Sequence, residues 1–189
     1  MSAKKKTASD LGTKSETNNI KVDENAPIET FGDGAIRSSK AGKGRYDLIP
    51  NLVIADLLED EIALLHCNDV LPSKPHELSF NIIKAINHRD WVRAIWFLTL
   101  SKYGNSEIWC IDAFNNMQVD LAKHYENGAE IYGENNWKHG IPKWSFISSG
   151  TRHAQQYING LTDEPHCISA IWNLVNALWC EQKERYGFE

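Results

Sequence analysis

The chain has 189 residues, of which 42% are hydrophobic and 24% charged, and its formal net charge is -5. This length and composition predict a single folded domain with one hydrophobic core. The acidic balance excludes a protein that coats nucleic acid, because that mode of binding depends on many Lys and Arg side chains that neutralise phosphates. A small anionic ligand needs only a local basic patch and stays compatible with the charge.

The cysteines and the first ten residues indicate the cellular compartment. The four cysteines, Cys67, Cys110, Cys167 and Cys180, have no CxxC spacing, and the chain opens on MSAKKKTASD rather than on an apolar segment. We therefore expect a reduced, cytoplasmic protein. No stretch approaches the roughly 20 uninterrupted apolar residues that span a bilayer, so we expect no membrane partner.

The first 50 residues differ in composition from the rest. Residues 1–30 are rich in Lys, Ser, Thr, Asn and Glu, which predicts a flexible tail ahead of one folded domain over residues 31–189. The stretch 31–50 contains four glycines and four cationic side chains, which is typical of a loop that lies close to a ligand or another chain.

From residue 51 onward, apolar residues recur with helical spacing. The predicted helices are Asn51–His66, His76–Ile86, Trp91–Leu100, 107–132, Ser145–Asn159 and His166–Glu184. Apolar residues cover most of the circumference of the last helix, which therefore belongs in the middle of a bundle. The predicted fold class is an all-α helical bundle.

Polar side chains interrupt the apolar pattern in the C-terminal half. They are Glu126, Arg152, His153, Asp163, Glu164, His166 and Asn173. Burying such groups without partners costs a few kcal/mol each, so they either satisfy one another or bind something. Carboxylates and imidazoles inside a helical bundle commonly hold a divalent ion. Surface charges and a satisfied core histidine are the alternative interpretation.

Two further patterns concern ligand binding. His166 and Asn173 are two helical turns apart and share a face with Ala170 and Ala177, which leaves room for a ligand or for close helix packing. In the loop AGKGRYDLIP, Lys43 and Arg45 beside two glycines would suit a cationic strap for phosphates, although a solvated basic turn has the same composition. The Walker A pattern is absent.

Four ordered blocks carry a resemblance to a known family. The strings GKGRYDLIP, ENGAEIYGENNW, TRHAQQYINGLTDEPH and AIWNLVNAL resemble the phage dATP/dGTP diphosphohydrolases, which are related to the MazG-like all-α nucleotide pyrophosphohydrolases. The resemblance implies a MazG-like bundle in which the unmatched residues 58–119 are an inserted helical segment. It also implies a protein of the host cytoplasm that acts in phage nucleotide metabolism.

The activity that this resemblance implies is hydrolysis of dGTP or dATP to the monophosphate and pyrophosphate, with Mg²⁺ or Mn²⁺ as cofactor. Carried onto this sequence, the implied metal ligands are Glu126 with Asp163 or Glu164, and Glu130 is a further candidate ligand. Lys43, Arg45 and Arg152 would bind phosphate, and His153, His166 and Asn173 would act in catalysis. Tyr132 and Trp137 would stack on the purine, or would instead be core aromatics.

The sequence also departs from the family pattern. Glu130 stands where the family commonly has Lys, Leu161 replaces an acidic residue, and the turn before His166 is shortened. These changes keep open a non-catalytic nucleotide-binding protein that sequesters its ligand. A structural protein that uses Trp91, Trp96 and Trp109 as a partner surface is a third hypothesis. By analogy with related helical enzymes, we expect a homo-oligomer, at least a dimer.

Overall fold

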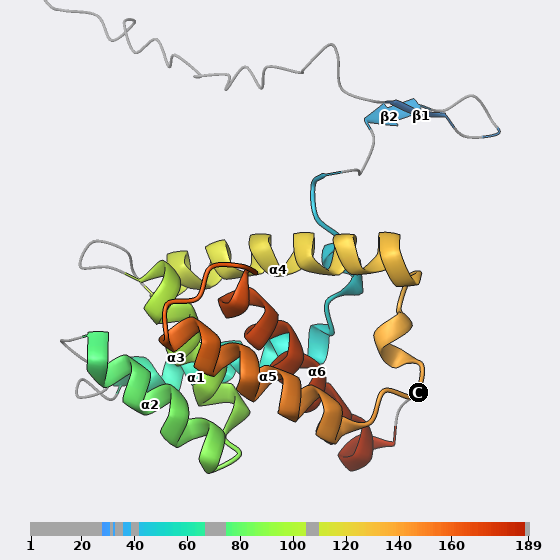
Figure 1. Ribbon diagram of the computed structural model, residues 1–189. Coiled ribbons are helices and arrows are strands. Elements are labelled where there is room, and N and C mark those ends of the chain that lie inside the picture. Colours follow the sequence, from blue (N-terminus) through green and yellow to red (C-terminus); the bar gives the residue numbers. More distant parts are fainter. Residues whose placement is uncertain are drawn as a thin grey trace, which may run out of the picture. The chain divides into compact units, whose positions relative to one another are not determined.

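The computed structural model describes residues 28–30, 32, 36–38, 42–66, 75–104 and 110–187. The chain divides into two compact units, Met1–Ser39 and Lys40–Glu189. Most of residues 1–30, which the sequence predicts to be a flexible tail, lie outside the described residues. The described part of the first unit is a β-hairpin, and that of the second is helical (Figure 1).

The hairpin consists of β1 (Ile28–Thr30) and β2 (Ile36–Ser38), which pair antiparallel. Ile28 lies opposite Ser38, and Thr30 lies opposite Ile36. The sequence did not predict this element, which joins the end of the expected tail to the expected loop. The β-branched residues favour extended backbone. With three residues in each strand, however, the alternation that identifies a strand is too short to recognise.

Every regular element described in the Lys40–Glu189 unit is helical, which confirms the all-α prediction for this unit. The α-helices are α1 (Asn51–His66), α2 (Pro75–Asn87), α3 (Trp91–Tyr103), α4 (Cys110–Tyr132), α5 (Lys143–Ile158) and α6 (His166–Tyr186). Two short 3-10 helices, η1 (Tyr46–Leu48) and η2 (Asn136–Lys138), precede α1 and α5. None of the described helices has the length and apolar character to cross a bilayer.

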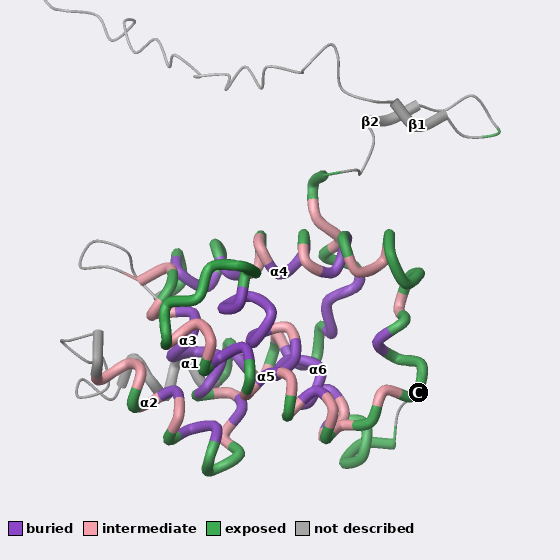
Figure 2. The backbone as a smooth tube through the Cα atoms, viewed as in Figure 1, coloured by how far each residue is buried: buried purple, intermediate pink, exposed green. Residues whose placement is uncertain are grey.

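Helix α6 runs through the core, as its apolar circumference predicts. From His166 to Trp179 every residue except Trp172 is buried, and the buried part of the chain is purple in Figure 2. Side chains anchor its C-terminal part to two other helices, because Trp91 Nε1 donates to Glu181 and Gln182 Nε2 donates to Asp56. The bundle thus fixes α6 at several points along its length.

Helices α5 and α6 lie unusually close together at Gly150. A Cβ atom at this position would lie 3.1 Å from Leu174 Cδ2 and 3.2 Å from Asn173 Cβ. This close approach sets the distance between the two helices, which carry most of the polar residues singled out by the sequence. The fold therefore brings Arg152 and His153 on α5 near His166 and Asn173 on α6.

Candidate functional site

A cavity of about 620 Å³ lies within the helical unit. Its wall comes from the second half of α4, the η2 segment, α5 and the first two turns of α6. The aromatic lining residues are Tyr125, Tyr132, Trp137 and Trp172, and the polar ones include His124, Asn127, Arg152, His153, Ser169 and Asn173. This volume and mixture are typical of a small-molecule site.

The aromatic part of the wall is a packed cluster. Trp137 contacts Tyr125 edge-on, with ring centroids 5.9 Å apart, and Trp179 with centroids 4.8 Å apart. Trp137 is only 5% exposed, whereas Tyr132 is 69% exposed. Among the described residues, Trp137 Nε1 is buried without a hydrogen-bond partner. Of the two predicted base-binding residues, one thus belongs to the core and the other stands at the surface, although both line the cavity.

A chain of polar contacts connects four residues at the α5–α6 end of the site. Arg152 NH2 lies 2.9 Å from His153 Nε2, and His153 Nδ1 lies 3.0 Å from His166 Nδ1. His166 Nε2 lies 2.8 Å from Asp163 Oδ1. Arg152 can only donate and the Asp163 carboxylate can only accept. All three hydrogen bonds therefore point the same way: Arg152 donates to His153, His153 donates to His166, and His166 donates to Asp163. Each imidazole is neutral in this arrangement.

The environment favours these protonation states. Burial lowers the pKa of His153, and the neighbouring Arg152 charge lowers it further. The hydrogen bond from His166 lowers the pKa of Asp163, whose carboxylate is therefore the charged end of the chain. His153 and His166 are 7% and 2% exposed. The sequence-based expectation that buried polar groups satisfy one another is met here by direct contacts.

The same residues can hold a metal ion. Ligand atoms of His153, Glu164 and His166 all lie within 4.8 Å of one another. Imidazole nitrogens and carboxylate oxygens are common ligands of divalent metal ions. Of the four predicted metal ligands, Glu164 belongs to this group, and Asp163 contacts it through His166. Neither Glu126 nor Glu130 is a member of it, and Glu130 is exposed.

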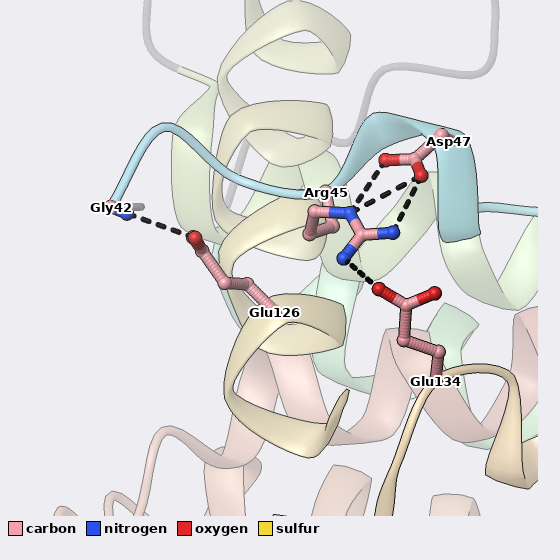
Figure 3. A network of polar contacts seen from close by, with 5 residues as sticks. All are labelled: Gly42, Arg45, Asp47, Glu126 and Glu134. Carbon is pink, nitrogen blue, oxygen red and sulfur yellow. Dashed lines mark hydrogen bonds and ion pairs between the residues drawn. The ribbon is translucent and has the colours of Figure 1, made fainter. Parts of the chain in front are cut away.

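Glu126 contacts the glycine-rich loop instead. Its two carboxylate oxygens accept hydrogen bonds from the backbone N–H groups of Gly42 and Gly44, each at 2.9 Å, and Figure 3 shows the first of these. Gly44 has a φ of +83° and approaches α4 so closely that an added Cβ would lie 2.8 Å from Ala122 Cβ. The loop therefore lies directly on α4, and Glu126 holds it there.

Arg45 is also engaged in this contact. Its guanidinium pairs with Asp47 at 2.7 Å and with Glu134 at 2.6 Å (Figure 3), and the hydrogen bond to Asp47 is the main reason why its pKa is raised. Of the three predicted phosphate-binding residues, Arg152 lines the cavity, whereas Lys43 and Arg45 do not. Asn173 lines it as well, with its Nδ2 donating to the Ser169 carbonyl.

The sequence did not single out His124, which also lines the cavity. Its ring lies against Trp172, with centroids 5.9 Å apart, and burial is the main reason why its pKa is lowered. The available signal was the spacing of His124, Gly128 and Tyr132, which recur every four residues on α4. All three line the cavity.

Comparison with known proteins adds one finding. Residues 101–187 match the family model described as dATP/dGTP diphosphohydrolase, N-terminal. No curated protein and no solved structure matches the chain. The matched residues contain the whole cavity lining except Leu48, and also His166, Asp163 and Glu164.

Proposed function

We propose that the protein hydrolyses dGTP or dATP to the monophosphate and pyrophosphate, with Mg²⁺ or Mn²⁺, because residues 101–187 match the family model described as dATP/dGTP diphosphohydrolase, N-terminal. The observation that carries the proposal is the cavity, since almost all of its wall lies inside the matched residues. The sequence resemblance extends the proposal to phage nucleotide metabolism, and analogy extends it to a homo-oligomer.

The cavity offers different chemistry to the two ends of a nucleotide. Tyr132, Trp137 and Trp172 provide ring faces and edges for a purine. Arg152 provides a charged donor, and charge-assisted hydrogen bonds to phosphate are among the stronger polar contacts in proteins. A base on the aromatic side and phosphates beside Arg152 would occupy the cavity without burying an unpaired charge.

A divalent metal would be held by His153, Glu164 and His166, whose donor atoms fit such an ion. When bound, the metal neutralises phosphate charge and makes a bound water more acidic. The chain's own residues would do the rest. Arg152 orients the phosphates, Asn173 has its amide fixed by the Ser169 carbonyl, and Asp163 holds the ring of His166 in place.

The second candidate function is nucleotide binding without turnover. It is favoured by the engagement of Glu126 with two backbone amides, which leaves Glu164 as the one carboxylate in the three-residue group found among the described residues. Phosphoryl-transfer sites usually neutralise much charge with their metals, so a site poor in carboxylates also suits a protein that only holds its ligand.

The decisive experiment measures pyrophosphate release from the four dNTPs with Mg²⁺ and with Mn²⁺, alongside equilibrium nucleotide binding. We expect release from dGTP or dATP, and Arg152→Ala should lower kcat/KM about 10- to 100-fold through loss of a charged hydrogen bond. Arg93→Ala removes an exposed arginine on α3 and serves as the control. Tight binding without release would support the second function, and absence of both would refute the two together.

A further inference from the structure

We propose that His153, His166 and Glu164 form a metal site of two imidazoles and one carboxylate that selects Mn²⁺ or another transition metal over Mg²⁺. The inference rests on the proposed function, since it names the ion that the hydrolysis would use. It also changes the ligand set, because the sequence resemblance implied carboxylates alone.

The distances within the group fit a bound ion. The two Nδ1 atoms lie 3.0 Å apart, and Glu164 Oε2 lies 3.7 Å from His153 Nδ1. Neighbouring ligands at about 2.0–2.2 Å from a metal are about 3 Å apart, so the imidazoles already have the required separation. The Glu164 side chain is 54% exposed and can move the short distance that remains.

The surroundings of His166 are those of a metal ligand. Because Asp163 accepts from Nε2, the proton of this ring is held on Nε2, and Nδ1 presents its lone pair to the group. A carboxylate that receives the second N–H of a ligating histidine is the usual outer partner in metal sites, where it fixes both the tautomer and the ring orientation. Asp163 thus acts as a positioning residue rather than as a ligand.

To bind a metal, His153 would have to change its tautomer. In the hydrogen-bonded chain it carries its proton on Nδ1, while Nε2 accepts from Arg152. To ligate through Nδ1, the neutral ring must carry the proton on Nε2 instead, and a protonated Nε2 cannot accept from Arg152. The number of protons is unchanged, but the Arg152 guanidinium loses this partner. Metal binding therefore leaves Arg152 NH2 available to a ligand in the cavity that both residues line, while NH1 keeps its hydrogen bond to Gln156.

The donor set decides which metal binds. Mg²⁺ takes oxygen ligands and gives up its waters reluctantly, whereas imidazole nitrogen is a common ligand of transition metals, among which Mn²⁺ binds more weakly than Co²⁺. With two nitrogen donors in three, the group disfavours Mg²⁺. Co²⁺ is a convenient probe, because it follows Mn²⁺ in affinity order and reports its ligands by visible absorption.

The test titrates chelator-treated, full-length protein with Co²⁺ in the absence of nucleotide. We expect saturation at one equivalent, competition by Mn²⁺, and no displacement by a 100-fold excess of Mg²⁺. Glu164→Gln and His166→Gln should weaken Co²⁺ binding at least 10-fold, and Asp163→Asn about 10- to 100-fold. Arg152→Ala should strengthen it, because the competing tautomer of His153 loses its partner. His88→Gln removes an exposed histidine in a turn and should change nothing.

Three outcomes would overturn the inference: no Co²⁺ binding, unchanged binding in both Glu164→Gln and His166→Gln, or displacement by equimolar Mg²⁺. The exposed position of Glu164 keeps the test informative if His166→Gln fails to fold. Selective metal binding without pyrophosphate release would refute the hydrolase and leave the site standing. Wild-type release with Mg²⁺ in Glu164→Gln and His166→Gln would refute the site and leave the hydrolase.

Discussion

At the scale of single residues, the burial of His124 should make the stability of the protein depend on pH. The pKa of His124 is lowered chiefly by desolvation, so below the ordinary value near 6.5 the unfolded chain takes up a proton that the folded chain resists. The free energy of unfolding should therefore fall as the pH drops from about 7.5 toward the lowered pKa of the folded state. Thermal midpoints across this range measure the effect.

The variant His124→Gln should show a shallower decline over the same pH range. Part of the decline should persist, because the pKa of His153 is lowered as well. His139→Gln removes an exposed histidine near the same cavity wall and should leave the slope as it is in the wild type. An unchanged slope in His124→Gln would mean that this ring is solvated in the folded protein.

Glu126 supports a second prediction. The variant Glu126→Gln keeps one acceptor oxygen but turns an NH₂ group toward an amide N–H of the glycine loop, so it loses a hydrogen bond and leaves a donor unmatched. We expect a loss of about 1–3 kcal/mol in the free energy of unfolding. Denaturant titration measures it, and Glu130→Gln, at an exposed position of α4, is the matched control.

A different result would revive the role that the sequence suggests. If Glu126→Gln unfolds like the wild type but binds metal much more weakly, Glu126 is a metal ligand and the loop contact is incidental. The sequence pattern was enough to infer that polar residues such as His153 and His166 are buried. The partner of Glu126 could not be, because Gly42 and Gly44 are more than 80 residues away and offer only backbone.

At the scale of secondary structure, periodicity predicts the helices well. The predicted helix over Asn51–His66 has the observed bounds of α1, and the predicted start of α6 at His166 is also observed. Long apolar stripes make such helices recognisable, and Pro165 marks the beginning of α6. What periodicity could not show is how closely the helices approach, which decides where the cavity lies.

Two helix glycines test that approach. At Gly128 on α4 nothing lies within 4 Å of an added Cβ, whereas at Gly150 the neighbours are at 3.1 and 3.2 Å. In an exposed helix interior, Gly→Ala stabilises by up to about 1 kcal/mol. We therefore expect Gly128→Ala to raise the thermal midpoint. Gly150→Ala should lower it, because the hydrogen bond from the Asn173 amide to the Ser169 carbonyl keeps Asn173 from moving away from the added methyl.

The same pair separates stability from ligand binding. Gly128 lines the cavity, so the added methyl of Gly128→Ala occupies ligand space and should weaken nucleotide binding even as the fold becomes more stable. Binding titrations alongside thermal melts would measure both effects. A more stable variant with wild-type affinity would mean that the ligand does not approach this turn of α4.

At the scale of the whole molecule, the described hydrophobic core belongs to one of the two units of the chain, Lys40–Glu189. The buried hydrophobic residues described in the structure run from Leu48 to Trp179, all within the Lys40–Glu189 unit. The cavity and the family match lie in this unit too. Composition predicts that residues 1–30 are dispensable, and the division after Ser39 gives a sharper boundary.

Two truncations separate the roles of the preceding residues. Removing residues 1–39 should leave the thermal midpoint within the roughly 2–4 °C that 1 kcal/mol produces in a chain of this size, and should leave pyrophosphate release intact. Removing residues 1–47 also deletes the glycine loop and Arg45, which leaves Glu126 without its two amide partners and Glu134 without its ion pair with Arg45. That truncation should melt several degrees lower. If the shorter truncation already destabilises the protein to the same extent, the first 39 residues contribute to the folded core, and the boundary after Ser39 is wrong.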